Sequence, residues 1–361
     1  MKQNYSPHFI IPPYMIAAIM NKNEENVTTF KAKVTNLQLD EQIRSRRKIF
    51  SSLSEKGRQI LAIEPVKDSA IAPNREVYTA NHQQIQPGKL VRKEGQKPVA
   101  DEDVNNAYDA AGYTFSFYYD LFNRNSIDNK GLKLIQTVHY GNKYDNAFWD
   151  GQQMIFGDGD GKIFASFTRD IDVIGHELTH GVVQYECNLD YQGQSGALNE
   201  SLADVFGIMI KQRAKNQDVT QSDWLIGENI LIGEQYALRS FKAPGTAYVN
   251  HPVLGTDPQP ANMSGYFNDP SDNGGVHTNS GITNHAFYLA ATAIGGFAWE
   301  KTGQIWYAAM CDTERVKPDA SFIDFKNATV YHAQQLFASD KTVAQAVEDA
   351  WNKVGVKEAS I

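Results

Sequence analysis

The chain has 361 residues, of which 42% are hydrophobic and 21% charged, values that are ordinary for a folded globular protein of more than one compact unit. Its formal net charge of −8 disfavours nucleic acid as a partner, because binding phosphates needs a clustered basic surface. Two cysteines, Cys187 and Cys311, exclude a disulfide-rich scaffold. Burial as two free thiols is favoured over a bridge between them, and the cellular compartment stays open.

Residues 1–65 are expected to form a separate N-terminal segment. An apolar run from Phe9 to Met20 resembles a signal peptide, but Pro12-Pro13 interrupts it and no small-x-small cleavage site follows. The run is also too short to span a membrane. We expect an extended stretch that leads into a short helix, then a polar, helix-favouring stretch to about residue 64. We therefore expect a protein that has no classical signal peptide or membrane span, is made in the cytoplasm and is secreted by a non-classical route.

Residues 66–171 are expected to form a strand-rich lobe. The stretch 62–74 is rich in helix breakers and predicts a linker, after which alternating residues predict strands over 76–92, 132–141 and 146–161. One long helix with apolar residues from Val104 to Tyr119 packs across them, and Asp103 is expected to cap it. The Gly-Asp run at 157–161 lacks the ligand pattern of an EF-hand and the Lys-Ser/Thr of a P-loop. A tight turn is therefore favoured over an ion or phosphate site there.

The strongest chemical signal lies at the start of the third unit, residues 172–361. The sequence IDVIGHELTHGVVQYE predicts one unbroken helix in which His176 and His180 lie four residues apart. Residues at this spacing share one face of a helix, so both imidazoles point the same way, while Glu177 borders that face. Two imidazoles suit a zinc ion, and a neighbouring carboxylate suits the water that such an ion would hold.

The following stretch, GALNESLADVFG, offers the remaining parts of a zinc site. Glu200 can be a third ligand, and Asp204 lies one turn further along as a partner behind the ligands. Three protein ligands leave a fourth position for water, whose pKa zinc lowers toward about 7. Glu177 would accept the proton of that water and pass it to the departing amine. Tyr191 or His277 could hold the oxyanion that forms.

The chain after residue 204 predicts a helical lobe, because apolar residues recur at helical spacing and strand signals are few. A loop over 243–275, rich in Pro, Gly, Asn and Asp, places His277 at the mouth of a helix begun near Asn279. Long loops of this kind tend to be functional, which favours His277 for the site. The expected helices cover 202–215, 279–293, 297–310, 321–337 and 341–354, and surface positions are expected for most other histidines, including His82, His251 and His332.

Several independent motifs, in the right order, resemble the thermolysin-like zinc metallopeptidases. They are HELTH at 176–180, GALNESLAD at 196–204, NAFWDGQQMIFGDGDG at 146–161 and DNGGVHTNSG at 272–281, and the resemblance runs from about Arg75 to the C-terminus. It implies an α+β fold with a β-rich N-terminal lobe, a central zinc-binding helix and an α-helical C-terminal lobe. It also implies a neutral metalloendopeptidase with one catalytic zinc ion, acting on peptides and proteins, with a protein inhibitor as a further candidate partner.

The same resemblance assigns a role to each matching residue. Zinc ligands would be His176, His180 and Glu200, backed by Asp204 and Asn199. Glu177 would be the general base, Tyr191 and His277 would stabilise the tetrahedral intermediate, and Asp272 would orient His277. The substrate backbone would bind to Asn146, Ala147, Trp149 and Arg239. The specificity pocket would consist of Phe164, Phe167, Val173 and Leu238, which implies cleavage on the amino side of bulky hydrophobic residues, although such apolar positions are also common in an ordinary core.

Two departures from thermolysin itself are informative. Its calcium cluster is acidic, but here Asp172, Asp223 and Glu228 alone match, while Lys211, Leu225 and Asn229 replace acids. An ammonium at Lys211 could substitute for a bound cation, so we expect at most one calcium ion.

The second departure is the short N-terminal segment, whose PPYM at 12–15 resembles the compact propeptide of the protealysin subgroup. We hypothesise that this segment covers the cleft and keeps the precursor inactive. The enzyme itself would remove it near 62–74, where helix-breaking residues favour proteolysis. A permanent docking arm is the alternative. Two other classes also stay open: a catalytically silent zinc protein that binds peptides, which an intact Glu177 argues against, and a structural zinc domain, which normally needs four protein ligands.

Overall fold

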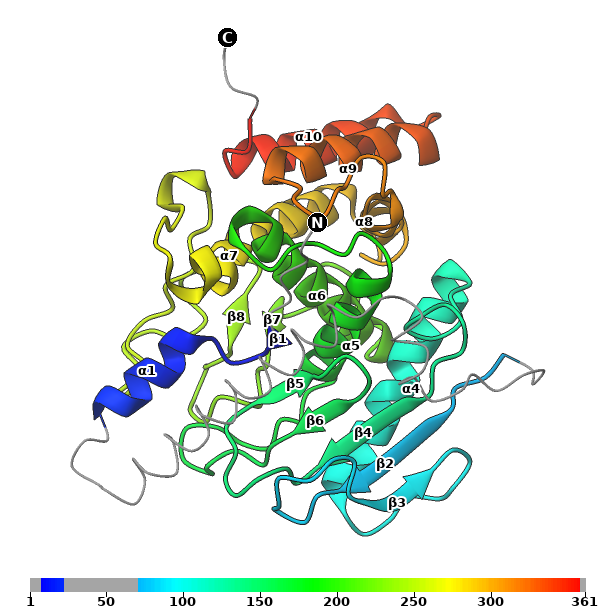
Figure 1. Cartoon of the computed structure of the whole chain (residues 1–361). Coiled ribbons are helices and arrows are strands. Elements are labelled where there is room, and N and C mark those ends of the chain that lie inside the picture. The colour runs from blue at the N-terminus through cyan, green and yellow to red at the C-terminus, as the bar shows by residue number, and fades with distance from the viewer. Residues whose placement is uncertain (1–7, 23–70, 358–361) are drawn as a thin grey trace.

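The structure is a computed structural model that describes residues 8–22 and 71–357, and it has the α+β architecture of two lobes that the sequence predicts (Figure 1). A β-rich lobe lies below two central helices, and further helices stack above them. The elements up to residue 156 are β1 (His8–Phe9), α1 (Pro13–Lys22), β2 (Arg75–Thr79), β3 (Lys89–Lys93), α4 (Glu102–Phe122), β4 (Leu134–Val138), β5 (Ala147–Trp149) and β6 (Met154–Phe156).

The six-stranded sheet has the order β1-β5-β6-β4-β2-β3. Strands β2, β4 and β6 run parallel, whereas β1 pairs antiparallel with β5 and β3 pairs antiparallel with β2. Strand β1 comes from the N-terminal segment and is aligned through His8 with Trp149 and through Phe9 with Phe148. The extended stretch and short helix expected after the N-terminus are therefore present, and the extended stretch extends the sheet of the β-rich lobe by one edge strand.

Helix α4 packs across the sheet, as its apolar periodicity predicts, but its cap differs from the expected one. The carboxylate of Asp101 accepts hydrogen bonds from the backbone N–H groups of Asp103 and Val104, at 3.1 and 3.3 Å. Asp101 is thus the N-cap, and the prediction of Asp103 was wrong by two residues. Asp103 instead lies in the first turn, where its negative charge interacts favourably with the positive end of the helix dipole.

Two buried helices, α5 (Ile171–Tyr185) and α6 (Gly193–Ala214), form the centre of the molecule (Figure 1). They touch backbone to backbone at Gly175 and Gly207. A Cβ atom at Gly207 would lie 2.6 Å from the carbonyl oxygen of Asp172 and 3.1 Å from the backbone nitrogen of His176. Only a residue without a side chain fits there, so the two glycines set how closely the helices approach.

The remaining elements form the helical lobe, with some boundaries shifted from the expected ones. Helix α6 begins at Gly193 and not near residue 202, and α7 begins at Ser271. Asp272 to Gly275 have left-handed backbone angles inside α7, so the regular turns start just before His277, close to the expected position. The elements are β7 (Leu225–Ile226), β8 (Arg239–Ser240), η1 (Met263–Gly265), α7 (Ser271–Ile294), α8 (Lys301–Cys311), α9 (Phe322–Leu336) and α10 (Lys341–Lys353).

The cysteines, the histidines and the loop after β6 differ in how well they match the expectations from the sequence. Cys187 and Cys311 are both free thiols. His251 is buried, contrary to the surface position expected for it. Residues 157–160 form an irregular loop and not the expected tight turn, and a bend follows at 161–163; Gly159 and Gly161 have positive φ. No helix within residues 8–22 and 71–357 combines the length and apolarity needed to cross a bilayer. The helix-favouring stretch before residue 64, and the linker up to residue 70, lie outside the described residues.

Candidate active site

The three residues predicted to bind zinc converge between α5 and α6. His176 Nε2 and His180 Nε2 lie 2.9 Å apart, and the Glu200 carboxylate lies 3.6 Å from the first and 3.5 Å from the second. All three side chains are buried. The two histidines come from consecutive turns of α5, and the glutamate comes from the facing side of α6, so the closely packed helix pair fixes all three positions.

The hydrogen bonds behind the imidazoles show which ring nitrogens face the centre. His176 Nδ1 lies 2.7 Å from Asp204 Oδ1, and His180 Nδ1 lies 2.9 Å from Asn199 Oδ1. Because both partners are acceptors, each Nδ1 carries the hydrogen and each Nε2 presents its lone pair to the other. Lone pairs 2.9 Å apart repel, and a cation between them removes that repulsion. Zinc bonds of about 2.0–2.1 Å in tetrahedral geometry separate donors by about 3.4 Å. The two distances to Glu200 fit this value, whereas the two imidazole nitrogens lie closer together.

Asp204 is the buried hub behind this group. Besides His176, it accepts two hydrogen bonds of 2.7 Å from the Arg239 guanidinium and one of 2.8 Å from Asn284 Nδ2. Burial alone would raise the pKa of Asp204, but Arg239 and His176 outweigh it and hold that pKa below its ordinary value. Asp204 therefore stays ionised and accepts the Nδ1 hydrogen bond of His176, which fixes the orientation of that imidazole ring.

Glu177 lies beside the histidines on α5 and contacts strand β5 of the sheet. Its Oε2 accepts a hydrogen bond of 3.1 Å from the backbone N–H of Trp149 in β5. The side chain is fully buried. A carboxylate held between the metal-binding group and the strand expected to bind peptides is well placed to move a proton between water and a peptide nitrogen.

Tyr191, His277 and Asp272 gather on the other side of Glu200. The Tyr191 hydroxyl donates a short hydrogen bond to Glu200 Oε1 and lies 3.2 Å from His277 Nε2. His277 Nδ1 lies 2.7 Å from Asp272 Oδ1, and its backbone N–H donates to Asp272 Oδ2 at 3.0 Å. Burial disfavours a charged His277, but the carboxylates of Asp272 and Glu200 outweigh it and raise its pKa to about 9. The left-handed turn before His277 brings the carboxylate of Asp272 back onto the imidazole.

The backbone of residues 9–11 occupies the groups expected to bind a substrate. His277 Nε2 lies 3.0 Å from the carbonyl oxygen of Phe9, and Arg239 Nη1 donates to the carbonyl oxygen of Ile10 at 3.1 Å. On the strand side, the N–H of Ile10 donates to the carbonyl of Ala147 at 3.3 Å, and the N–H of Ile11 donates to Asn146 Oδ1 at 3.1 Å. Together with the β1–β5 pairing, these contacts place an extended peptide across the site by strand addition (Figure 1).

The four apolar residues expected to form the specificity pocket are all fully buried. The rings of Phe164 and Phe167 lie 5.8 Å apart, between centroids, in a tilted arrangement. Val173 belongs to α5, and Leu238 immediately precedes Arg239 in the chain. Their burial is equally consistent with an ordinary core, so their role as a pocket stays a prediction.

Lys211 lies inside the acidic cluster where thermolysin would have calcium. Its Nζ is 2.9 Å from Asp172 Oδ2, 3.0 Å from Asp223 Oδ1, 4.0 Å from Glu228 Oε1 and 2.7 Å from the carbonyl oxygen of Leu225. Burial opposes the charge of Lys211, but these carboxylates outweigh it and raise its pKa. The ammonium thus contacts each of the three acidic residues that match the calcium cluster.

Sequence reasoning missed two sets of residues that belong to the site. Asn284 binds Asp204 from α7, and it carries no motif that would single it out. Phe9, Ile10 and Ile11 reach the site just ahead of the PPYM motif. Their apolar character before Pro12-Pro13 was visible in the sequence, but their contact partners lie far away in the chain.

Comparisons with known proteins agree with this geometry. The family model described as "Thermolysin metallopeptidase, catalytic domain" matches residues 53–184, and "Thermolysin metallopeptidase, alpha-helical domain" matches residues 187–356. An extracellular metalloprotease of Pectobacterium carotovorum subsp. carotovorum is 52% identical over 286 residues, which cover 79% of this chain and 81% of that protein. Protease PrtS of Photorhabdus sp. (strain Az29) is 44% identical, covering 98% of this chain and 94% of that protein.

A solved structure, the precursor of protealysin, a metalloproteinase from Serratia proteamaculans, superimposes with a TM-score of 0.84 at 46% identity. The match covers 97% of this chain and 100% of that chain, so it extends over the N-terminal segment as well as both lobes. The chain belongs to the thermolysin family of zinc metallopeptidases.

Proposed function

We propose that this metallopeptidase cleaves peptide bonds on the amino side of bulky hydrophobic residues, with His176, His180 and Glu200 holding its catalytic zinc ion. The observation that carries the proposal is the convergence of two lone-pair nitrogens and one carboxylate beside Glu177. A site with three protein ligands keeps a position for water, whereas structural zinc normally has four protein ligands.

The chemistry assigned to the protein groups follows from their positions. When bound, zinc supplies a water of lowered pKa and polarises the peptide carbonyl. Glu177 takes the proton of the attacking water and delivers it to the nitrogen of the departing amine. The Tyr191 hydroxyl and His277 Nε2 donate to the oxyanion as it develops, and Asp272 keeps the imidazole aimed at it.

The contacts of residues 9–11 support the proposed assignment of the substrate-binding groups. A substrate in the same position would donate to the Ala147 carbonyl and to Asn146 Oδ1, and would accept from Arg239. Main-chain contacts of this kind are independent of side-chain identity. Selectivity would therefore come from the apolar pocket, for which Phe164, Phe167, Val173 and Leu238 are the proposed lining.

We further propose a three-part organisation, with residues 1–65 as a propeptide, 66–171 as the β-rich lobe and 172–361 as the zinc helix and helical lobe. The backbone of residues 9–11 fills the proposed substrate-binding groups, so the precursor would be inactive until these residues leave. Removal by the enzyme itself near 62–74 remains part of the proposal. Extracellular action is also proposed, in line with the name of the Pectobacterium relative. A protein inhibitor would have to compete for the same edge of β5.

The activity is tested with a quenched fluorescent peptide that carries Phe or Leu after the scissile bond. Matured protein should hydrolyse it, a zinc chelator should abolish hydrolysis, and added zinc should restore it. Glu177→Gln should bind zinc normally and lose roughly 3–4 orders of magnitude in kcat, since it lacks the base. Cleavage that persists in the chelator or in Glu177→Gln would contradict the mechanism.

Propeptide removal needs a separate measurement. Mass spectrometry of the wild type and of Glu177→Ala, purified identically, should show a shortened N-terminus in the wild type alone. Identical processing of both proteins would mean that another protease removes the segment, and two intact proteins would favour a permanent docking arm.

A further inference from the structure

A second cluster of side chains that could bind a metal ion is formed by residues other than His176, His180 and Glu200. His82 follows β2, His139 follows β4 and Asp158 follows β6. These three strands are parallel neighbours in the sheet, in the order β6-β4-β2, so their carboxyl ends meet at one edge. Side chains that follow parallel strands at this edge commonly form ligand sites in sheets of this kind.

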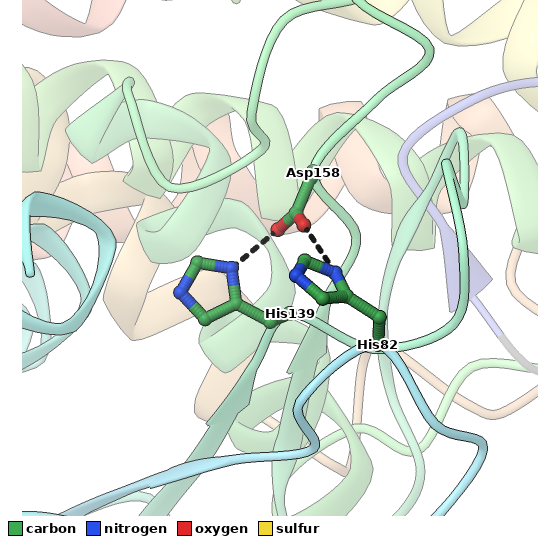
Figure 2. Close-up of side chains that lie close together, drawn as sticks. All are labelled: His82, His139 and Asp158. Atoms are coloured by element: carbon green, nitrogen blue, oxygen red, sulfur yellow. Dashed lines mark hydrogen bonds and ion pairs between the residues drawn. The ribbon is translucent and has the colours of Figure 1, made fainter.

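The two imidazoles converge on one carboxylate, as Figure 2 shows. His139 Nδ1 lies 2.8 Å from Asp158 Oδ1, and His82 Nδ1 lies 3.1 Å from Asp158 Oδ2. The rings are 5.5 Å apart between centroids. One ligand atom from each of the three residues lies within 4.8 Å of the others. The side chain of His82 is 58% exposed, so the cluster opens to solvent and an ion can enter.

A further carboxylate supports His139 from behind. Asp101 Oδ2 lies 3.0 Å from His139 Nε2, while the other oxygen of Asp101 caps α4. Metal-binding histidines commonly donate their second ring N–H to a carboxylate in this way, which leaves the first nitrogen free for the metal. The helix cap fixes Asp101, and Asp101 in turn fixes the ring of His139.

We propose that His82, His139 and Asp158 form a second metal site, selective for a zinc-like divalent transition metal ion. Two imidazole nitrogens and one carboxylate oxygen suit zinc, nickel or copper better than calcium or magnesium, which favour oxygen ligands alone. None of the three residues belongs to the active site.

An ion at this position would fasten the loop after β6 to the rest of the lobe. The residues on either side of Asp158 already bind the strand region ahead of β5, because the N–H of Gly157 donates to the carbonyl of Asn146 and that of Gly159 to the carbonyl of Tyr144. A metal ion would add a link from this loop to the ends of β2 and β4. The expected role is to stabilise the lobe that carries the peptide-binding strand.

The test measures zinc content by equilibrium dialysis and elemental analysis, on full-length protein carrying Glu177→Gln so that the chain stays intact. The background protein should bind two zinc ions, one of them at the active site. His82→Asn should bind one, because asparagine tolerates the left-handed backbone of residue 82, with φ of 60°, but brings no imidazole. Asp158→Asn should weaken the second ion at least tenfold.

His332→Gln is the matched control. His332 also pairs with a carboxylate, at 2.9 Å from Asp312, but within the described part of the chain it belongs to none of the side-chain groups that could bind a metal ion. It should keep two zinc ions. Zinc should also raise the melting temperature of the background protein more than that of His82→Asn, while both melt alike in chelator. Equal zinc content in the background and His82→Asn proteins would overturn the proposal, and so would a background protein that binds one ion.

Discussion

Replacing Lys211 with methionine is expected to destabilise the protein by about 3–5 kcal/mol, because it removes one partner of a buried ion pair. The Lys211 side chain is 1% exposed, and the carboxylate of Asp172 at 2.9 Å is fully buried. Methionine preserves the length and the apolar stem of lysine, so the cavity term is small and the missing ammonium dominates. The carboxylates that surround it would be left without their shared cation.

The assay is thermal unfolding of full-length protein in a Glu177→Gln background. At roughly 2–4 °C per kcal/mol for large domains, a loss of about 3–5 kcal/mol should lower the melting temperature by roughly 6–20 °C. Lys215→Met is the matched control, because Lys215 Nζ pairs with the same Glu228 at 2.9 Å but is 43% exposed. Exposed pairs contribute less than about 1 kcal/mol, so this variant should unfold almost as the background does.

Calcium supplies the second arm of the same experiment. Lys211→Glu converts the cluster into an all-acidic one, and calcium should then raise its melting temperature while leaving the wild-type cluster unaffected. If Lys211→Met melts within about 1 °C of Lys215→Met, or if calcium stabilises Lys211→Glu no more than the parent, Lys211 does not act as the cation of this cluster.

Three further expectations concern other parts of the molecule. Asn199→Ala should weaken zinc binding roughly 10–100-fold in dialysis, while Asn199→Asp, which keeps an acceptor, should lose less. Glu94 has its pKa lowered because Arg75, with two contacts of 2.6 Å, outweighs the effect of burial. The advantage of the wild type over Glu94→Gln in urea unfolding should therefore be complete above about pH 4.3 and disappear as the pH falls further; a constant difference down to about pH 2 would refute this. Ile10→Asp, which places a charge at a buried position, should raise peptide cleavage by the uncleaved precursor roughly tenfold or more, whereas Ala17→Asp at an exposed position should not.

Local periodicity was enough to predict the centre of the site. His176 and His180 share a face of α5 because four residues make about one helical turn, and this relation does not depend on the rest of the fold. Glu200 and Asp204 repeat the same spacing on α6. The α+β fold and the metallopeptidase family, both predicted from these motifs, are confirmed by the fold and by the family models.

Contacts that depend on how distant elements meet were beyond such reasoning. Asn284 meets Asp204 because α7 packs against α6, and no spacing in the sequence encodes that contact. The N-cap of α4 was predicted two residues too late. Asp101 and Asp103 are chemically equivalent candidates for the cap, and backbone geometry alone decides between them.

The cluster of His82, His139 and Asp158 could not be predicted from the sequence by considering each residue separately. His82 was expected at the surface, where it lies, whereas Asp158 was expected in a tight turn and lies in an irregular loop. Their meeting with His139 requires β4 to lie between β2 and β6, an order that strand patterns in the sequence do not specify.

The close contact of α5 and α6 at Gly175 and Gly207 also sets the spacing of the proposed zinc ligands. Two donors stand on one helix and the third on the other, so the distance between the helix axes sets the diameter of the ring of donors. A Cβ atom at Gly175 would lie 3.3 Å from the Cα atom of Gly207, so even a methyl group would widen that ring by a few tenths of an ångström. Ions differ in preferred bond length by similar amounts. We therefore expect Gly175 and Gly207, which have no side chains, to influence which ion the proposed zinc site prefers.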